Sequence, residues 1–148
     1  MLRYANIGKR FLALLIDSLI VGLLELCLVG VLYAVAIGFG YLIGDAGGAF
    51  VFGLGAWIVT PALGLAIALI YFIKGESGPD QGTIGKRVMD IKVVSIDGST
   101  LTAGRSVGRF LCRFFSSLFF GLGYLLALFN DKRQTLHDMI AGTMVLER

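Results

Sequence analysis

The stretch FLALLIDSLIVGLLELCLVGVLYAVAIGF, residues 11–39, is apolar except for Asp17, Glu25 and a few small polar side chains. A helix needs about 20 consecutive apolar residues to cross the hydrocarbon core of a bilayer. This run is longer, so we expect a spanning helix over about residues 11–38 that is tilted or projects beyond the bilayer. Residues 49–73 form a second run without any charged residue, and they predict a second spanning helix.

The composition agrees with an all-α integral membrane protein of one domain, residues 1–148. Hydrophobic residues make up 57% of the chain and charged residues 16%, and the mean hydropathy is +0.85. A soluble domain carries about 25% charged residues. The net charge of +3 comes with basic residues that flank the apolar runs, which indicates contact with anionic lipid and not with nucleic acid.

Glycine and other small residues mark the junction of the two runs and one face of the second. We expect a flexible glycine-rich turn over residues 38–48 and a bend at Pro61. A stripe of small residues at every fourth position follows the second run: Ala56, Thr60, Gly64 and Ala68. Such a stripe allows close helix contact, either with another subunit or with the first helix of the same chain.

A polar segment, residues 74–104, follows the second run. Residues 88–96 predict a strand, Asp97-Gly98 a tight turn and residues 99–102 a short return strand, so we expect a small cytoplasmic β-hairpin. The sequence GTIGK at residues 82–86 is not a phosphate-binding loop, because Asp80 and Arg87 replace the required Gly and Ser or Thr. We interpret it as a turn that carries interfacial cations.

The third apolar segment, residues 105–129, is ambiguous. Arg105, Arg109 and Arg113 are spaced four apart, and they predict an interfacial basic face whose side chains reach outward to the headgroups. Few apolar residues remain beyond Arg113, and small residues interrupt them: Ser116, Ser117, Gly121 and Gly123. Both a tilted span and a re-entrant helix fit. The tail, residues 130–148, predicts a short helix and then a strand that can pair with residues 88–96.

Charge indicates the orientation in a bacterial-type inner or plasma membrane. The turn between the two runs has no Lys or Arg, whereas the N-terminal segment has three and residues 74–113 have seven. The positive-inside rule therefore predicts a cytoplasmic N-terminus and middle segment. A re-entrant third segment would place all 13 basic residues on that side, and we favour it for this reason. Asp17 interrupts the first run and no A-x-A-like site follows, so we expect an uncleaved span and not a signal peptide.

Two acids lie within the first span. A charged side chain in hydrocarbon costs about 2.5–3.5 kcal/mol, so Asp17 should face protein, water or a cation, or be protonated. Arg10 precedes it by seven residues and lies within about 20° of the same helical face. The two residues form either an ion or proton site or a pair that locks helix packing. Glu25 is a secondary intramembrane acid, which either extends a cation path or reaches protein or interfacial water.

These residues and several motifs together resemble the RDD family. They are Arg10, Asp17, QTLHD at residues 134–138, AGTMV at residues 141–145, GTIGKR at residues 82–87 and Asp97-Gly98. The resemblance covers nearly the whole chain. The family is named for one arginine and two aspartates, which would here be Arg10, Asp17 and Asp138. The resemblance implies a membrane protein, for which a role in transport, including cation/proton exchange, has been suggested, and it implies no shared enzymatic activity.

We therefore expect an oligomeric transporter of a cation or proton, with Asp17 as the ion-binding acid and Arg10 tuning it. The alternative is a non-catalytic accessory or assembly subunit that binds other membrane proteins. No catalytic residue, cofactor or metal is expected, because His137-Asp138 is the only His–acid pair and lacks a nucleophile. Asp138 is a candidate partner for Arg10 or for the Arg105, Arg109 and Arg113 face. The sequence leaves open the substrate, the oligomeric state and the side of the tail.

Overall fold

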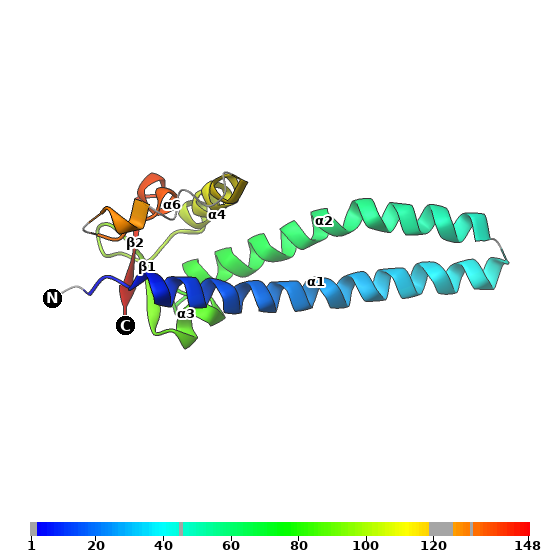
Figure 1. Ribbon diagram of the computed structural model, residues 1–148, viewed down its shortest axis with the longest axis horizontal. Coiled ribbons are helices and arrows are strands. Elements are labelled where there is room, and N and C mark those ends of the chain that lie inside the picture. The colour runs from blue at the N-terminus through cyan, green and yellow to red at the C-terminus, as the bar shows by residue number, and fades with distance from the viewer. Residues whose placement is uncertain (1–2, 45, 119–125, 131) are drawn as a thin grey trace. The chain divides into compact units, whose positions relative to one another are not determined.

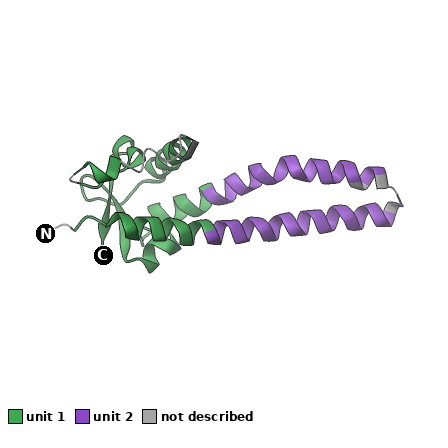
Figure 2. Ribbon diagram, viewed as in Figure 1, with its two compact units in different colours: residues 1–18, 69–148 green, residues 19–68 purple. Residues whose placement is uncertain are grey.

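The computed structural model describes residues 3–44, 46–118, 126–130 and 132–148, which fall into two compact units. Unit 1 consists of residues 1–18 and 69–148, and unit 2 consists of residues 19–68 (Figure 2). Each of the two long helices contributes residues to both units (Figure 2).

Unit 2 consists of most of α1 (Ile7–Ile43) and α2 (Ala46–Ser77). The stretches Ile7–Leu42 and Phe50–Ser77 are long and apolar enough to span a membrane. Large apolar side chains are exposed along them: Leu19 is 66% exposed and Trp57 is 71% exposed. A core helix of a soluble protein would bury these side chains, whereas a helix in lipid leaves them facing acyl chains. The two predicted apolar helices are confirmed, and both are longer than predicted.

The glycine-rich turn predicted over residues 38–48 is wrong. Helix α1 continues through Gly38 and Gly40 to Ile43, and α2 begins at Ala46. Glycine costs about 1 kcal/mol relative to alanine inside a helix, which apolar neighbours can offset. Among the described residues of this turn, only Gly44 has a left-handed backbone, with φ of 66°, as is usual just after a helix ends. Pro61 lies inside α2 and has no backbone N–H to donate to the Trp57 carbonyl. The hydroxyl of Thr60 donates to this carbonyl instead.

The stripe of small residues on α2 packs within the chain at Gly64. A Cβ atom on Gly64 would collide with the Glu25 carboxylate of α1, so the two helices approach closely there. Farther along, the rings of Phe39 and Phe52 meet edge to face with centroids 5.3 Å apart. These contacts support the interpretation of the stripe as packing on the first helix of the same chain.

Unit 1 combines the start of α1 and the end of α2 with the remaining elements. These are α3 (Ile84–Val88), β1 (Ile91–Ser95), α4 (Ala103–Leu118), the 3-10 helix η1 (Leu126–Leu128), α6 (Leu136–Ile140) and β2 (Thr143–Glu147). Strands β1 and β2 pair antiparallel, with Val93 opposite Val145 (Figure 1). The core contains apolar side chains from both strands and from the N-terminal segment: Ala5, Ala13, Ile91, Val93, Leu101 and Val145.

The predicted hairpin is therefore corrected. The turn at Asp97 forms, with the Ser99 amide donating to the Asp97 carboxylate and Gly98 at φ of 80°, but no strand returns over residues 99–102. Strand β1 pairs with the tail strand β2, the pairing that the apolar tail also predicted. Since four of five β2 residues are buried, the apolar tail strand covers β1 better than the polar residues after the turn would.

The third apolar segment begins as α4, which ends at Leu118. Residues 119–125, including Gly121 and Gly123, lie outside the described residues, so neither the spanning nor the re-entrant form is established. Over the described ranges, α1 and α2 are the two helices long and apolar enough to cross a membrane.

Candidate functional site

A buried carboxylate, Asp138, links three elements of unit 1. Arg10 of α1 donates to it through Nη1 at 2.8 Å, and Nη2 of Arg109 in α4 lies 2.7 Å from its other oxygen. Thr135 and Asp138 form a capping box at the start of α6, in which the Thr135 amide donates to the carboxylate at 3.2 Å. The local sequence of α6 therefore orients the acid, and the two arginines come from distant parts of the chain.

A second buried carboxylate, Glu76 near the end of α2, forms ion pairs with three cationic side chains. The Lys86 ammonium of α3 bonds to it, Arg113 Nη2 lies at 3.2 Å and Arg109 Nη1 at 3.7 Å. Arg109 thus contacts both carboxylates and joins the two clusters. We call these six side chains, Arg10, Glu76, Lys86, Arg109, Arg113 and Asp138, the charge network. Removing one partner from such a buried ion pair typically costs about 3–5 kcal/mol.

Asp17 has a different set of partners, and those within the described residues are all neutral. Its carboxylate accepts hydrogen bonds from the Tyr71 hydroxyl at 2.7 Å, the Thr83 hydroxyl and the Gly85 amide at 2.8 Å. Gly85 is required here, because a Cβ atom would collide with the carbonyl of Ala13. Asp17 therefore ties α1 to the end of α2 and to the start of α3, while Arg10 pairs with Asp138.

Burial and neighbouring charges set the protonation states of Asp138, His137 and Lys86. Burial alone would raise the pKa of Asp138, but Arg109 and Arg10 hold this pKa well below its usual range, so the carboxylate is ionised. Burial lowers the pKa of His137 to about 3, so its ring is neutral at physiological pH. Burial also lowers the pKa of Lys86 to about 8, although Glu76 opposes this shift.

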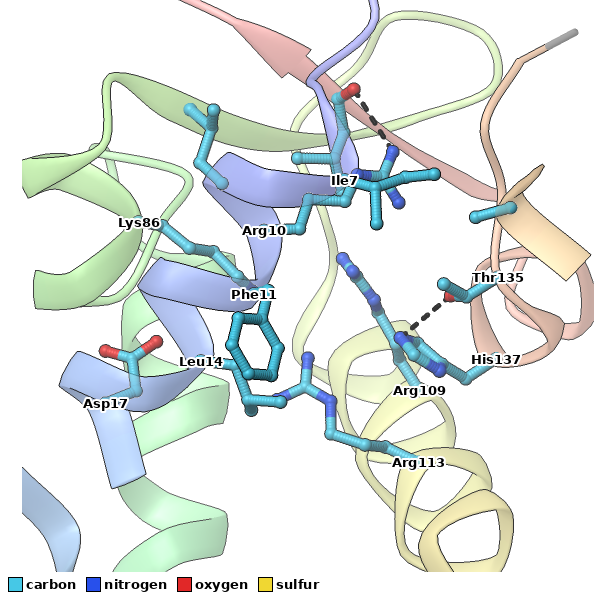
Figure 3. Close-up of a pocket in the computed structure, with 13 residues that line it drawn as sticks. Ile7, Arg10, Phe11, Leu14, Asp17, Lys86, Arg109, Arg113, Thr135 and His137 are labelled. Atoms are coloured by element: carbon cyan, nitrogen blue, oxygen red, sulfur yellow. Dashed lines mark hydrogen bonds between the residues drawn. The ribbon is translucent and has the colours of Figure 1, made fainter. Parts of the chain in front are cut away.

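A pocket of about 290 Å³ lies beside the charge network (Figure 3). Its charged lining comes from Arg10, Asp17, Lys86, Arg109 and Arg113, and the rest is mostly apolar. Figure 3 shows Arg113 extending from α4 toward Phe11 and Leu14 of α1, and Arg109 extending toward Arg10. Among the residues that the structure describes, no group of three or more His, Cys, Asp or Glu side chains could hold a metal ion.

The predicted interfacial basic face is wrong for two of its three arginines. Arg109 is 2% exposed and Arg113 is partly buried, and both turn inward to carboxylates. Only Arg105 is exposed, where it donates to the Ser95 hydroxyl. Spacing places the three residues on one helical face but does not say what that face meets.

Sequence reasoning missed Glu76 and Lys86. A signal for Glu76 was present, since it is the only acid between residues 49 and 79. Lys86 was interpreted as an interfacial cation, but it is 7% exposed and paired. Glu25 lies in unit 2 beside Gly64.

Two apolar helices of membrane-spanning length, with a buried network of arginines and carboxylates in unit 1, define a membrane-type protein. More specifically, the chain belongs to the RDD family, whose profile matches residues 4–142.

Its relatives include an uncharacterized protein, YxaI, of Bacillus subtilis, which is 30% identical over 62% of this chain and 60% of the relative. The proline-rich antigen of Mycobacterium leprae is 35% identical over 62% of this chain and 35% of the relative. A homolog of that antigen in Mycobacterium tuberculosis is 36% identical over 54% of this chain and 35% of the relative. The matched part thus spans less than two thirds of each relative. No solved structure matches this chain.

Proposed function

We propose that this chain is a subunit of an oligomeric membrane transporter for a cation or proton, with Asp17 as the acid that binds the ion. The observation that carries the proposal is the environment of Asp17: it is 1% exposed, and its hydrogen-bond partners are neutral donors. A buried carboxylate without a cationic partner leaves a negative charge that a proton or a cation can compensate.

Arg10 acts on Asp17 indirectly in this proposal. Its guanidinium is engaged by Asp138, yet Arg10 and Asp17 line the same pocket. If Arg10 left Asp138 and approached Asp17, it would favour the ionised carboxylate and expel a proton or compete with a cation. The Arg10–Asp138 pair would then hold Asp17 ready to bind.

An oligomer is part of the proposal because one chain offers too few helices to enclose a path. Two helices of membrane-spanning length are present within the described ranges. We propose that the N-terminus and the middle segment face the cytoplasm, because three basic residues precede the first apolar run and seven lie within residues 74–113.

Ion or proton exchange in everted vesicles, with Asp17→Asn as the variant, tests the proposal. We expect exchange to be lost, because the amide cannot carry the negative charge. Asp90→Asn is the matched control, since Asp90 is an exposed acid whose φ of 54° asparagine also adopts. Undiminished exchange with correctly folded Asp17→Asn protein would overturn the proposal.

A non-catalytic accessory or assembly subunit is the second candidate. The three hydrogen bonds of Asp17 to two other helices, which a purely structural lock would also need, favour it. Co-purification after gentle solubilisation distinguishes the two: a stoichiometric foreign membrane protein without ion flux supports the accessory role, and a homo-oligomer with flux supports transport. Neither candidate requires an enzymatic activity.

A further inference from the structure

We propose that the pocket of unit 1 binds an anionic amphiphile, a phosphate or carboxylate head group attached to an acyl chain. The head group meets the arginines and the chain lies against the apolar wall. This inference does not depend on ion transport, because it concerns what occupies the pocket and not what crosses the membrane.

The apolar wall is the first observation. Side chains from four elements form it: Ile7, Phe11 and Leu14 of α1, Ile91 of β1, Val145 of β2 and Ala127 of η1. The pocket holds about 290 Å³. Apolar walls with a few polar groups converging at one place are typical of sites for ligands that carry both an apolar part and a charged part.

The charge balance is the second observation. Four cations line the pocket, Arg10, Lys86, Arg109 and Arg113. Two buried carboxylates pair with them, Glu76 and Asp138, whereas Asp17 is bonded by neutral donors. The cations therefore exceed the acids, and this excess lies in a buried place where charge is expensive to leave uncompensated. An anionic group neutralises it, whereas a metal cation would increase it.

Unused donors are the third observation. The Nε atoms of Arg10 and Arg113 are buried, and over the described part of the chain neither has a hydrogen-bond acceptor. These two arginines come from α1 and α4 and line the same pocket. A phosphate or carboxylate offers several oxygens, so one head group can accept from both, and arginine is the side chain best suited to such contacts.

The test uses the full chain purified in a neutral detergent. Binding of phosphatidylglycerol is measured by native mass spectrometry and by the unfolding midpoint, beside phosphatidylcholine with the same acyl chains and inorganic phosphate. We expect phosphatidylglycerol to bind and to raise the midpoint, with little effect from the other two. Equal binding of both lipids, or stabilisation by inorganic phosphate alone, would overturn the proposal.

Variants locate the binding. Leu14→Trp fills the pocket without changing any charge, and Arg113→Gln removes one cation. Arg113→Gln should weaken phosphatidylglycerol binding about tenfold or more, the loss expected for one charge-assisted contact. Leu14→Trp should also weaken binding, because the indole takes the space that the acyl chain would fill. Lys132→Gln is the control, because it removes the same charge from an exposed residue outside the pocket. If Leu14→Trp binds as tightly as the parent, or Lys132→Gln loses as much as Arg113→Gln, the lipid adsorbs to the surface and the proposal fails.

Discussion

The guanidinium of Arg10 donates to the carboxylate of Asp138 at 2.8 Å, across 128 positions of the chain. The two side chains are 13% and 1% exposed. This pair ties the first turn of α1 to the short helix α6 near the other end of the chain. Of the three residues that the resemblance singles out, Arg10 and Asp138 bond directly to each other, and Asp17 bonds to separate partners.

Replacing Asp138 should lower the free energy of unfolding more than replacing Arg10. Asp138→Asn removes the carboxylate that both Arg10 and Arg109 contact, although Arg109 keeps its contact with Glu76, so we expect a loss of about 3–5 kcal/mol in the free energy of unfolding. Arg10→Gln leaves Asp138 paired with Arg109 and should cost less. Denaturant unfolding of the purified protein in detergent measures both.

The exposed pair between Arg87 and Asp80 provides the control for that comparison. Its side chains are 46% and 53% exposed, so Asp80→Asn should change stability by less than about 1 kcal/mol. Equal losses for Asp138→Asn and Arg10→Gln would contradict a network in which Asp138 serves two arginines.

The hydrogen bond from Thr83 to Asp17 should contribute measurably to stability. Thr83 is 1% exposed, and its hydroxyl donates to a buried carboxylate. Thr83→Val keeps the shape and removes the donor, so we expect a loss of about 1.5–3 kcal/mol, the value typical of bonds to charged groups. Thr83→Ser keeps the hydroxyl and should recover most of that stability. If serine and valine behave alike, packing and not the hydrogen bond accounts for the effect.

Gly85 should not tolerate a methyl group. A Cβ atom there would collide with the Ala13 carbonyl and lie 2.8 Å from an oxygen of Asp17. Gly85→Ala should therefore cost about 1–3 kcal/mol through overpacking, and it should also disturb the amide that donates to Asp17. Gly108→Ala is the matched control, because no atom of the described residues lies within 4 Å of its Cβ position in α4. Since alanine favours helix by up to about 1 kcal/mol over glycine, this control should be neutral or stabilising.

Sequence reasoning succeeded where the cause is local and failed where the partner is distant. The apolar runs predicted α1 and α2 because the length needed to cross a bilayer is a property of one segment. The ends of these helices were missed, because Gly38 and Gly40 stay helical among apolar neighbours.

The candidate site was harder to predict, because its contacts are long-range. The spacing of Arg109 and Arg113 correctly places them on one face, but their carboxylates come from α2 and α6. The hairpin failed for the same reason: β1 had a better partner in the tail than in the residues after its turn. Arg10 and Asp138 stood out by resemblance. Glu76 and Lys86 were missed, although Lys86 lies in the GTIGKR motif and Glu76 is the only acid between residues 49 and 79.

His137 should make the protein sensitive to mild acid. Burial lowers the pKa of His137 to about 3 in the folded protein, whereas an unfolded histidine titrates at about 6.5. Below pH 6.5 the unfolded chain therefore binds a proton that the folded protein does not, so stability falls as pH falls. The stabilisation is complete above about pH 6.5 and decreases by about 1.4 kcal/mol for each pH unit below it, or about 2 kcal/mol at about pH 5.

A loss of stability between about pH 6.5 and about pH 5 can be assigned to His137. It is the only histidine in the chain, and carboxyl groups titrate mainly below about pH 4.5. Unfolding midpoints at about pH 7.5 and about pH 5 should differ in the parent protein and differ much less in His137→Gln. Glutamine is the suitable replacement, since its amide can take the place of the ring Nε2, which lies 3.0 Å from the Thr135 hydroxyl. An acid loss between about pH 7.5 and about pH 5 that persisted unchanged in His137→Gln would contradict the prediction. Carboxylates such as Asp138, whose pKa is held low in the folded protein, lose their stabilisation only as pH falls through the unfolded pKa of about 3.9.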